Sequence, residues 1–449
     1  MTQQRKSDGS WVKEPTAILV IHGIGQQNPL ETIDQFGRTL VSSLSEQLKC
    51  KLQLSHRLSK KTSSNKLDVW FDNFLRIERI ENGQVVGDPI DVYEFYWAHY
   101  TEDQATLTDI SKWVSEVTSG AKKFYRENAE LGKKYKDSSA FFSNKKFRFW
   151  KYNLLIHLIG GFIPALTFFI EQGAKVVAYI PIVGIPFRWF VTWLADTKMK
   201  QLANVIGDIT IYNTVDQKCK FYRIRQEILN GAVKAIRYLI EPDKTNSEKP
   251  NYGKVLIAGH SLGSQVSYDA INRLIHLANA NELEGFENDT DKLSKVMCGL
   301  VTFGSPLDKI AFFLRENVPA NQYIRLQLLN NFHSFKQRDW VPEAGKAWLY
   351  PIKPVFKRLL EEMTWINFFD KRDYVSGSLD YYRNLENVDM QFKSNIFSFT
   401  HSNYWTSEKM FNQIISTYLV PGKNNTASSN GTTAKNAHIP ETATVLTNP

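Results

Sequence analysis

Ser261 is the side chain whose sequence surroundings best fit covalent chemistry. It is the centre of Gly-His-Ser-Leu-Gly at residues 259–263, directly after the apolar run 255–258. A serine at a sharp strand-to-helix turn is held in a strained conformation with its hydroxyl exposed, and flanking glycines leave room for the neighbouring strand and helix. Apolar residues then recur at helical spacing, at Val266, Ala270, Leu274 and Leu277. The pattern predicts a strand, a turn and a helix, with Ser261 as nucleophile.

A serine hydroxyl needs a histidine as general base and a carboxylate that orients the histidine. Where such a turn carries the serine, the acid and then the base follow later in the chain. His401 is the only histidine between Asp373 and the polar C-terminal tail, so we predict it as the base. Asp373 is the preferred acid, and Asp370, at the end of the preceding apolar run, is the alternative acid. Asp308 is a third choice, because it comes early in the chain.

The oxyanion formed when a serine attacks a carbonyl needs two backbone N–H donors. We expect one from Leu262, which follows the nucleophile and begins the predicted helix. The other is expected from His-Gly-Ile-Gly at residues 22–25, with Ile24 as first choice and Gly25 as the next. His260 is predicted to be structural, with its side chain pointing away from the serine hydroxyl.

The elements that must position these residues are those of an α/β fold. Short apolar runs, typical of buried parallel strands, occupy residues 17–21, 255–258, 296–303 and 364–369. Residues 69–80 and 90–97 are predicted to be strands joined by an Asn-Gly turn. Apolar stripes predict helices within residues 30–48, 224–239 and 408–419. We expect a loop at 51–66 and a short strand at 323–329. The predicted class is a mostly parallel sheet flanked by helices.

A basic and then apolar segment separates the first strands from the serine turn. Residues 101–151 are rich in lysine and arginine, and residues 153–170 and 176–187 carry no formal charge. A bilayer crossing needs about 20 apolar residues, and glycines and prolines interrupt both runs. Three interpretations of residues 153–194 stay open: a membrane-dipping hairpin, a true crossing, and a soluble helical lid over the site. We expect residues 145–195 to face a membrane surface from the cytoplasmic side.

Composition narrows the classes of function. The chain has 449 residues and a formal charge of +9, but its lysines are spread along the chain and no nucleic-acid motif is present, so we expect no nucleic-acid partner. Its three cysteines lack metal-like spacing, so we expect neither disulfides nor a metal site. The expected organisation is a flexible N-terminus at 1–14, a core at 15–110 and 205–420, an insertion at 111–204 and a disordered tail at 421–449.

Taken together, these motifs resemble the α/β-hydrolase superfamily, and within it the lipase-like serine esterases. The resemblance rests on residues 22–25, 259–263, 303–307, Asp373 and 401–405, and it covers roughly residues 15–110 and 205–420. It implies the α/β-hydrolase fold and a serine hydrolase that acts on acyl esters without a cofactor. The long insertion departs from a compact member of that superfamily.

The leading hypothesis is a membrane-associated lipase or carboxylesterase that cleaves a lipid-like acyl ester through an acyl-enzyme on Ser261. An acyltransferase is an alternative, because the same triad can pass the acyl group to an alcohol other than water. A membrane-associated scaffold that keeps the fold without turnover is the second alternative, because fold does not fix function.

Overall fold

The computed structural model of the chain describes residues 11–23, 28–58, 73–101, 212, 220–242, 250–287, 289–314, 322–337, 357–373, 375–392 and 400–420. It also gives the backbone of a two-stranded ribbon, β5 (Phe142–Ser143) and β6 (Lys146–Phe147). The rest of the expected insertion 111–204, including the apolar residues 153–194, lies outside the described residues. The expected disordered tail 421–449 lies outside them as well.

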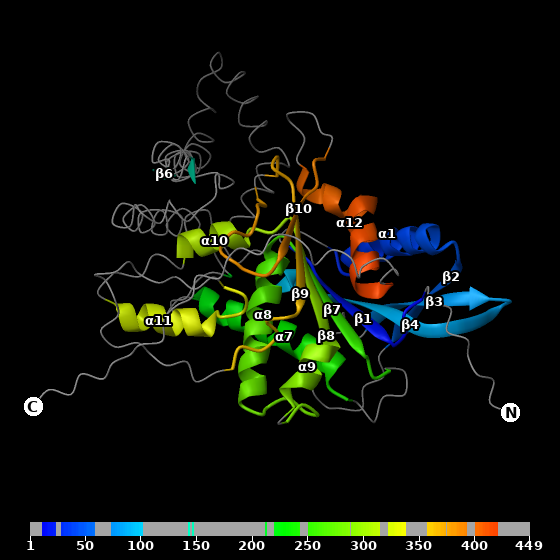
Figure 1. The fold of residues 1–449 in the computed structure, drawn as a ribbon, viewed down its shortest axis with the longest axis horizontal. Helices are drawn as coiled ribbons and strands as arrows, with labels where there is room; N and C mark the ends of the chain where they lie inside the picture. The colour runs from blue at the N-terminus through cyan, green and yellow to red at the C-terminus, as the bar shows by residue number, and fades with distance from the viewer. Residues whose placement is uncertain are drawn as a thin grey trace, which may run out of the picture.

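A mixed eight-stranded sheet is the centre of the fold (Figure 1). Its strands lie in the order β10-β9-β8-β7-β1-β4-β3-β2. Their bounds are β1 Thr16–Ile21, β2 Lys51–Leu58, β3 Asn73–Glu81, β4 Gln84–Phe95, β7 Lys254–His260, β8 Met297–Phe303, β9 Thr364–Phe369 and β10 Glu386–Asp389. Neighbours from β10 to β4 are parallel, whereas β3 and β2 extend the sheet antiparallel. The predicted α/β class with a mostly parallel sheet is confirmed.

Alternate residues of the central strands contribute to two cores, one on each face of the sheet. In β1, Ala17, Leu19 and Ile21 belong to one core, and Ile18 and Val20 belong to the other. All five side chains are fully buried. A strand that is covered on both faces has no polar side, so its sequence is a continuous apolar run. This is why the sequence predicts the central strands well.

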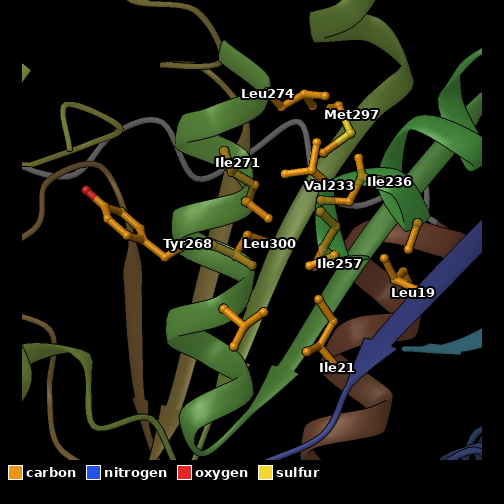
Figure 2. Close-up of a cluster of buried hydrophobic side chains, with 14 of the residues drawn as sticks. Leu19, Ile21, Val233, Ile236, Ile257, Tyr268, Ile271, Leu274, Met297 and Leu300 are labelled. Atoms are coloured by element: carbon orange, nitrogen blue, oxygen red, sulfur yellow. The ribbon is translucent and has the colours of Figure 1, made fainter. Parts of the chain in front are cut away.

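Helices cover both faces (Figure 1). On one face lie α7 (Lys220–Ile240) and α8 (Leu262–Asn279), and on the other lie α1 (Glu31–Leu48) and α12 (Glu408–Ile414), which a single π-helical turn extends through Ile415–Leu419. Figure 2 shows the first core, where Ile271 of α8 and Val233 of α7 gather with Ile257 of β7. The remaining helices are η1 Ala98–Tyr100, α9 Thr290–Val296, α10 Leu307–Leu314, α11 Tyr323–Phe332 and η5 Thr400–Thr406.

Two sequence-based predictions of local structure were wrong. Residues 51–58 form the edge strand β2, paired along its whole length with β3, rather than the start of a loop. Residues 323–332 form helix α11 rather than a short strand. The predicted hairpin is confirmed, with Asn82 and Gly83 in its turn at positive φ.

The packed core also reaches into the part of the chain that was expected to be a flexible terminus. Trp11 and Val12 are buried. The Trp11 Nε1–H donates to the carbonyl of Asp88 at 2.8 Å. The Trp11 ring lies over Gly87, where a β-carbon would come within 2.5 Å of the indole Cδ1. Residues 1–10 lie outside the described residues.

Candidate active site

Ser261 occupies a strained turn between β7 and α8. Its backbone has φ 52° and ψ −127°, a combination that a residue with a side chain rarely adopts. The Ser261 N–H donates to the carbonyl of Phe303 at the end of β8 (3.0 Å), which fastens the turn to the neighbouring strand. The residue is 1% exposed, and its hydroxyl has no hydrogen-bond partner among the described residues. Nothing in the described structure therefore engages the hydroxyl as a structural group.

The two glycines of the motif are needed for packing, as the sequence predicted. A β-carbon at position 259 would lie 2.7 Å from the Cα of Ser264 and 2.8 Å from the carbonyl oxygen of Gly263. A β-carbon at position 263 would overlap the carbonyl oxygens of Ile21 and His22. Helix α8 can therefore approach both its own turn and the end of β1 only because these positions carry no side chain.

The His22-Gly23 turn packs directly against Ser261. A β-carbon at Gly23 would lie 2.5 Å from the Cβ and 3.1 Å from the Oγ of Ser261. Leu262, the expected first oxyanion donor, is the first residue of α8, where backbone N–H groups lack partners within the helix. The expected second donors, Ile24 and Gly25, lie outside the described residues.

His22 holds this turn in place as a neutral imidazole. Its Nδ1–H donates to the carbonyl of Gly23 at 2.6 Å, and its Nε2 accepts from the backbone N–H of Trp97 at 3.0 Å. The Trp97 indole stacks on the His22 ring and donates to the His22 carbonyl. Burial lowers the pKa of His22 to about 4, so the ring stays uncharged at neutral pH.

The predicted base and the preferred acid are hydrogen-bonded to each other. The His401 Nδ1–H in η5 donates to Oδ2 of Asp373, in the turn after β9, at 2.8 Å. Both side chains are buried. Burial alone would raise the pKa of Asp373, but the hydrogen bond and charge of His401 and the N–H of Val375 hold it at about 2. The acid is therefore ionised at neutral pH and can orient the imidazole.

The other candidate acids have different partners. The two oxygens of Asp370 accept from the backbone N–H groups of Arg372 (2.8 Å) and Phe392 (2.6 Å). Asp308 accepts from the backbone N–H of Tyr381 at 2.8 Å. Both carboxylates fasten loops, and only Asp373 is bonded to His401.

His260 and Gly304 both contact His401, and His260 is the residue before Ser261. The Nε2–H of His260, the residue before Ser261, donates to the carbonyl of His401 at 3.2 Å, and the two rings lie 4.8 Å apart. Gly304, at φ +62° after β8, faces the His401 ring, where a β-carbon would lie 3.0 Å from Cε1. Burial holds the pKa of His260 well below its usual value. The bond of His260 to the His401 backbone fits a structural role, which stays a prediction.

Several polar residues around Asp373 were not predicted from the sequence. Tyr404 and Ser376 bond to each other and surround the carboxylate, and the Lys309 ammonium donates to the carbonyl of Ser376 at 2.8 Å. Burial lowers the pKa of Lys309 to about 8, while Asp373 and Asp308 oppose that shift. The only available signal was the spacing of Tyr404, which follows His401 by three residues in a short helical turn.

Comparisons with protein-family models, with curated proteins and with solved structures gave no significant match. Within the described ranges, no group of three or more His, Cys, Asp or Glu side chains is arranged to hold a metal ion. Among the same residues, no helix combines the length and apolar character that a membrane crossing requires.

Proposed function

We propose that this chain is a serine ester hydrolase with the α/β-hydrolase fold. The observation that carries the proposal is the 2.8 Å bond between His401 and Asp373 beside the strained turn of Ser261. Ser261 follows β7, Asp373 follows β9, and His401 packs against Gly304 at the end of β8, which lies between those strands. All three residues therefore lie at one carboxyl edge of the parallel sheet. Open α/β sheets bind their ligands at that edge.

Each residue has a defined step in this proposal. The Ser261 Oγ attacks the ester carbonyl carbon while its proton passes to Nε2 of His401. His401 returns the proton to the alcohol oxygen as the C–O bond breaks, which leaves an acyl group on Ser261. Water, deprotonated by His401, then releases the acid and restores the hydroxyl. Asp373 holds the Nδ1–H throughout, and Leu262 with Ile24 or Gly25 donates to the oxyanion.

A substitution at the nucleophile tests the proposal. Ser261→Ala should abolish turnover of p-nitrophenyl butyrate and covalent labelling by a fluorophosphonate, because both require this hydroxyl. Ser267→Ala is the matched control, since it removes a buried hydroxyl of the same helix that bonds to the carbonyl of Gly263. The control should be labelled like the wild type. Labelling of Ser261→Ala, or no labelling of the wild type, would overturn the proposal.

We further propose lipid-like acyl esters as the substrate class and a membrane surface as a partner. Support comes from the uncharged runs 153–170 and 176–187 beside the basic stretch 101–151. Product analysis with added alcohols separates a hydrolase from an acyltransferase, because a transferase would form new esters. A non-catalytic scaffold would show no Ser261-dependent labelling in the experiment above.

A further inference from the structure

Asp373 accepts more hydrogen bonds than the one that a catalytic histidine supplies. Its Oδ2 accepts from the Nδ1–H of His401 at 2.8 Å and from the hydroxyl of Tyr404 at 3.1 Å. Its Oδ1 accepts from the backbone N–H of Val375 at 2.9 Å. Tyr404 is fully buried, so its hydroxyl cannot exchange this partner for bulk water.

The Tyr404 hydroxyl belongs to a chain of donors. Its oxygen lies 3.0 Å from Oγ of Ser376, and that Oγ accepts from the backbone N–H of Asp370 at 3.4 Å. Because Tyr404 gives its proton to Asp373, the Ser376 hydroxyl can donate to the phenol oxygen. This series of hydrogen bonds therefore runs from the end of β9 to the carboxylate of Asp373, and each bond polarises the next.

Local structure imposes this position on Tyr404. His401 and Tyr404 are three residues apart in the 3₁₀ turn η5, and side chains at that spacing lie on the same side of such a turn. Phe392 packs edge-on against the Tyr404 ring with centroids 5.0 Å apart. On another side, a β-carbon at Gly304 would lie 3.2 Å from Cε2 of Tyr404. The turn and its packing direct base and phenol to the same carboxylate.

We propose that Tyr404 is a positioning residue, whose hydroxyl fixes the orientation and the basicity of the triad acid Asp373. This inference rests on the proposed function of the site. A carboxylate oxygen has two lone pairs, and Tyr404 occupies one on Oδ2, which leaves the other for His401. The shared bond also weakens the pull of Asp373 on the imidazole proton, so the proton stays on His401.

The first test needs no turnover. The Nδ1–H of His401 should give a strongly deshielded proton resonance in protein labelled with ¹⁵N-histidine, and His401→Gln should abolish it. Tyr404→Phe keeps the ring and should shift that resonance, and Ser376→Ala should shift it less in the same direction. Tyr418→Phe is the matched control, because its buried hydroxyl bonds to backbone groups of β8 and β9, among them the carbonyls of Leu300 and Thr364. A resonance that is absent in the wild type, or unmoved in Tyr404→Phe, would overturn the inference.

The second test uses ester hydrolysis as a function of pH. Without the Tyr404 hydroxyl, the unshared charge of Asp373 holds the imidazolium of His401 more tightly. The acid limb of kcat/KM should therefore move up by about half to one pH unit, and kcat should fall about fivefold with little change in KM. If Tyr404 were purely structural, Tyr404→Phe would lower the amount of folded enzyme and leave the acid limb of kcat/KM at the same pH. If the wild type lacks turnover dependent on Ser261, the proposed function fails, while the resonance test still decides the role of Tyr404.

Discussion

Two carboxylates three residues apart, Asp370 and Asp373, have different environments after β9. Both are buried, and both accept backbone N–H groups. Asp370 uses one oxygen for the turn and the other for Phe392 beyond β10, so it ties two chain segments together. One oxygen of Asp373, Oδ2, accepts from the side chains of both His401 and Tyr404. The division of partners indicates a structural role for the first acid and supports the orienting role for the second.

Exchanging each acid for its amide should separate the two roles. Asp373→Asn should lower kcat/KM for a p-nitrophenyl ester about a thousandfold or more, with little loss of stability, because an amide cannot stabilise the imidazolium. Asp370→Asn should keep activity in the folded enzyme and lower the free energy of unfolding by about 1–2 kcal/mol, because one acceptor oxygen is lost. Turnover and urea unfolding at neutral pH measure both. The opposite pattern would assign the acid to Asp370.

At the level of elements, the approach of helix α8 to strand β1 decides whether the serine turn can form. Gly263→Ala would place a methyl group on the carbonyl oxygens of Ile21 and His22, which are backbone atoms and cannot rotate away. We expect a loss of about 3 kcal/mol or more in the free energy of unfolding, together with loss of fluorophosphonate labelling.

Gly377→Ala is the matched control for this substitution. A β-carbon at position 377 meets no described atom within 4 Å, so this variant should unfold like the wild type and be labelled normally. Thermal unfolding and labelling of the two variants give the comparison. Equal stability of Gly263→Ala and Gly377→Ala would contradict the packing argument.

The elements that were predicted well from the sequence are those that are buried on all sides and therefore tolerate only apolar residues. Central strands such as β1 are buried on both faces, so their composition alone identifies them. Strand β2 was missed because it lies at the sheet edge, where most of its polar side chains face solvent. Helix α11 was mistaken for a strand because Ile324 and Leu328 are exposed, so its apolar residues do not mark a buried face.

The order of residues along the sequence was enough to predict part of the candidate site. His401 and Asp373 follow from the order serine, acid, base, and the structure brings these two residues together. The partners of Asp373 could not be predicted in the same way. Tyr404 reaches the carboxylate only because η5 is a 3₁₀ turn, and Ser376 only because its loop folds back onto the end of β9. The spacing of His401 and Tyr404 is visible in the sequence, but the folding of the loop that brings Asp373 and Ser376 to them is not.

For the molecule as a whole, the candidate site shares one edge of the sheet with the last residues described before the long insertion. Strand β4 is parallel to β1, and β1 is parallel to β7, so the carboxyl end of β4 lies at the edge that carries Ser261. The backbone N–H of Trp97, just beyond β4, bonds to His22 in the turn beside the serine. Thr101, the last residue described before that segment, follows this end of β4 by six residues. We propose that the insertion delivers substrate, on the ground of its uncharged runs 153–170 and 176–187.

The charge of +9 gives the delivery proposal a measurable consequence. The full-length protein should float with vesicles that contain phosphatidylserine at low salt, and should bind much less in high salt or to pure phosphatidylcholine vesicles. Each lysine near an anionic surface contributes about 1 kcal/mol, so replacing three of them in the basic stretch by glutamine should weaken partitioning about a hundredfold. The three are Lys133, Lys134 and Lys136.

Three exposed lysines elsewhere, replaced by glutamine together, provide the matched control, because they change the net charge equally: Lys49, Lys51 and Lys295. If the basic stretch forms the contact, this control should float almost like the wild type. Equal weakening of both triple variants would show that net charge alone attracts the protein to the vesicle. No flotation of the wild type at low salt would leave the soluble lid as the interpretation of residues 153–194, because a membrane-dipping or membrane-crossing segment would hold the protein on vesicles regardless of charge.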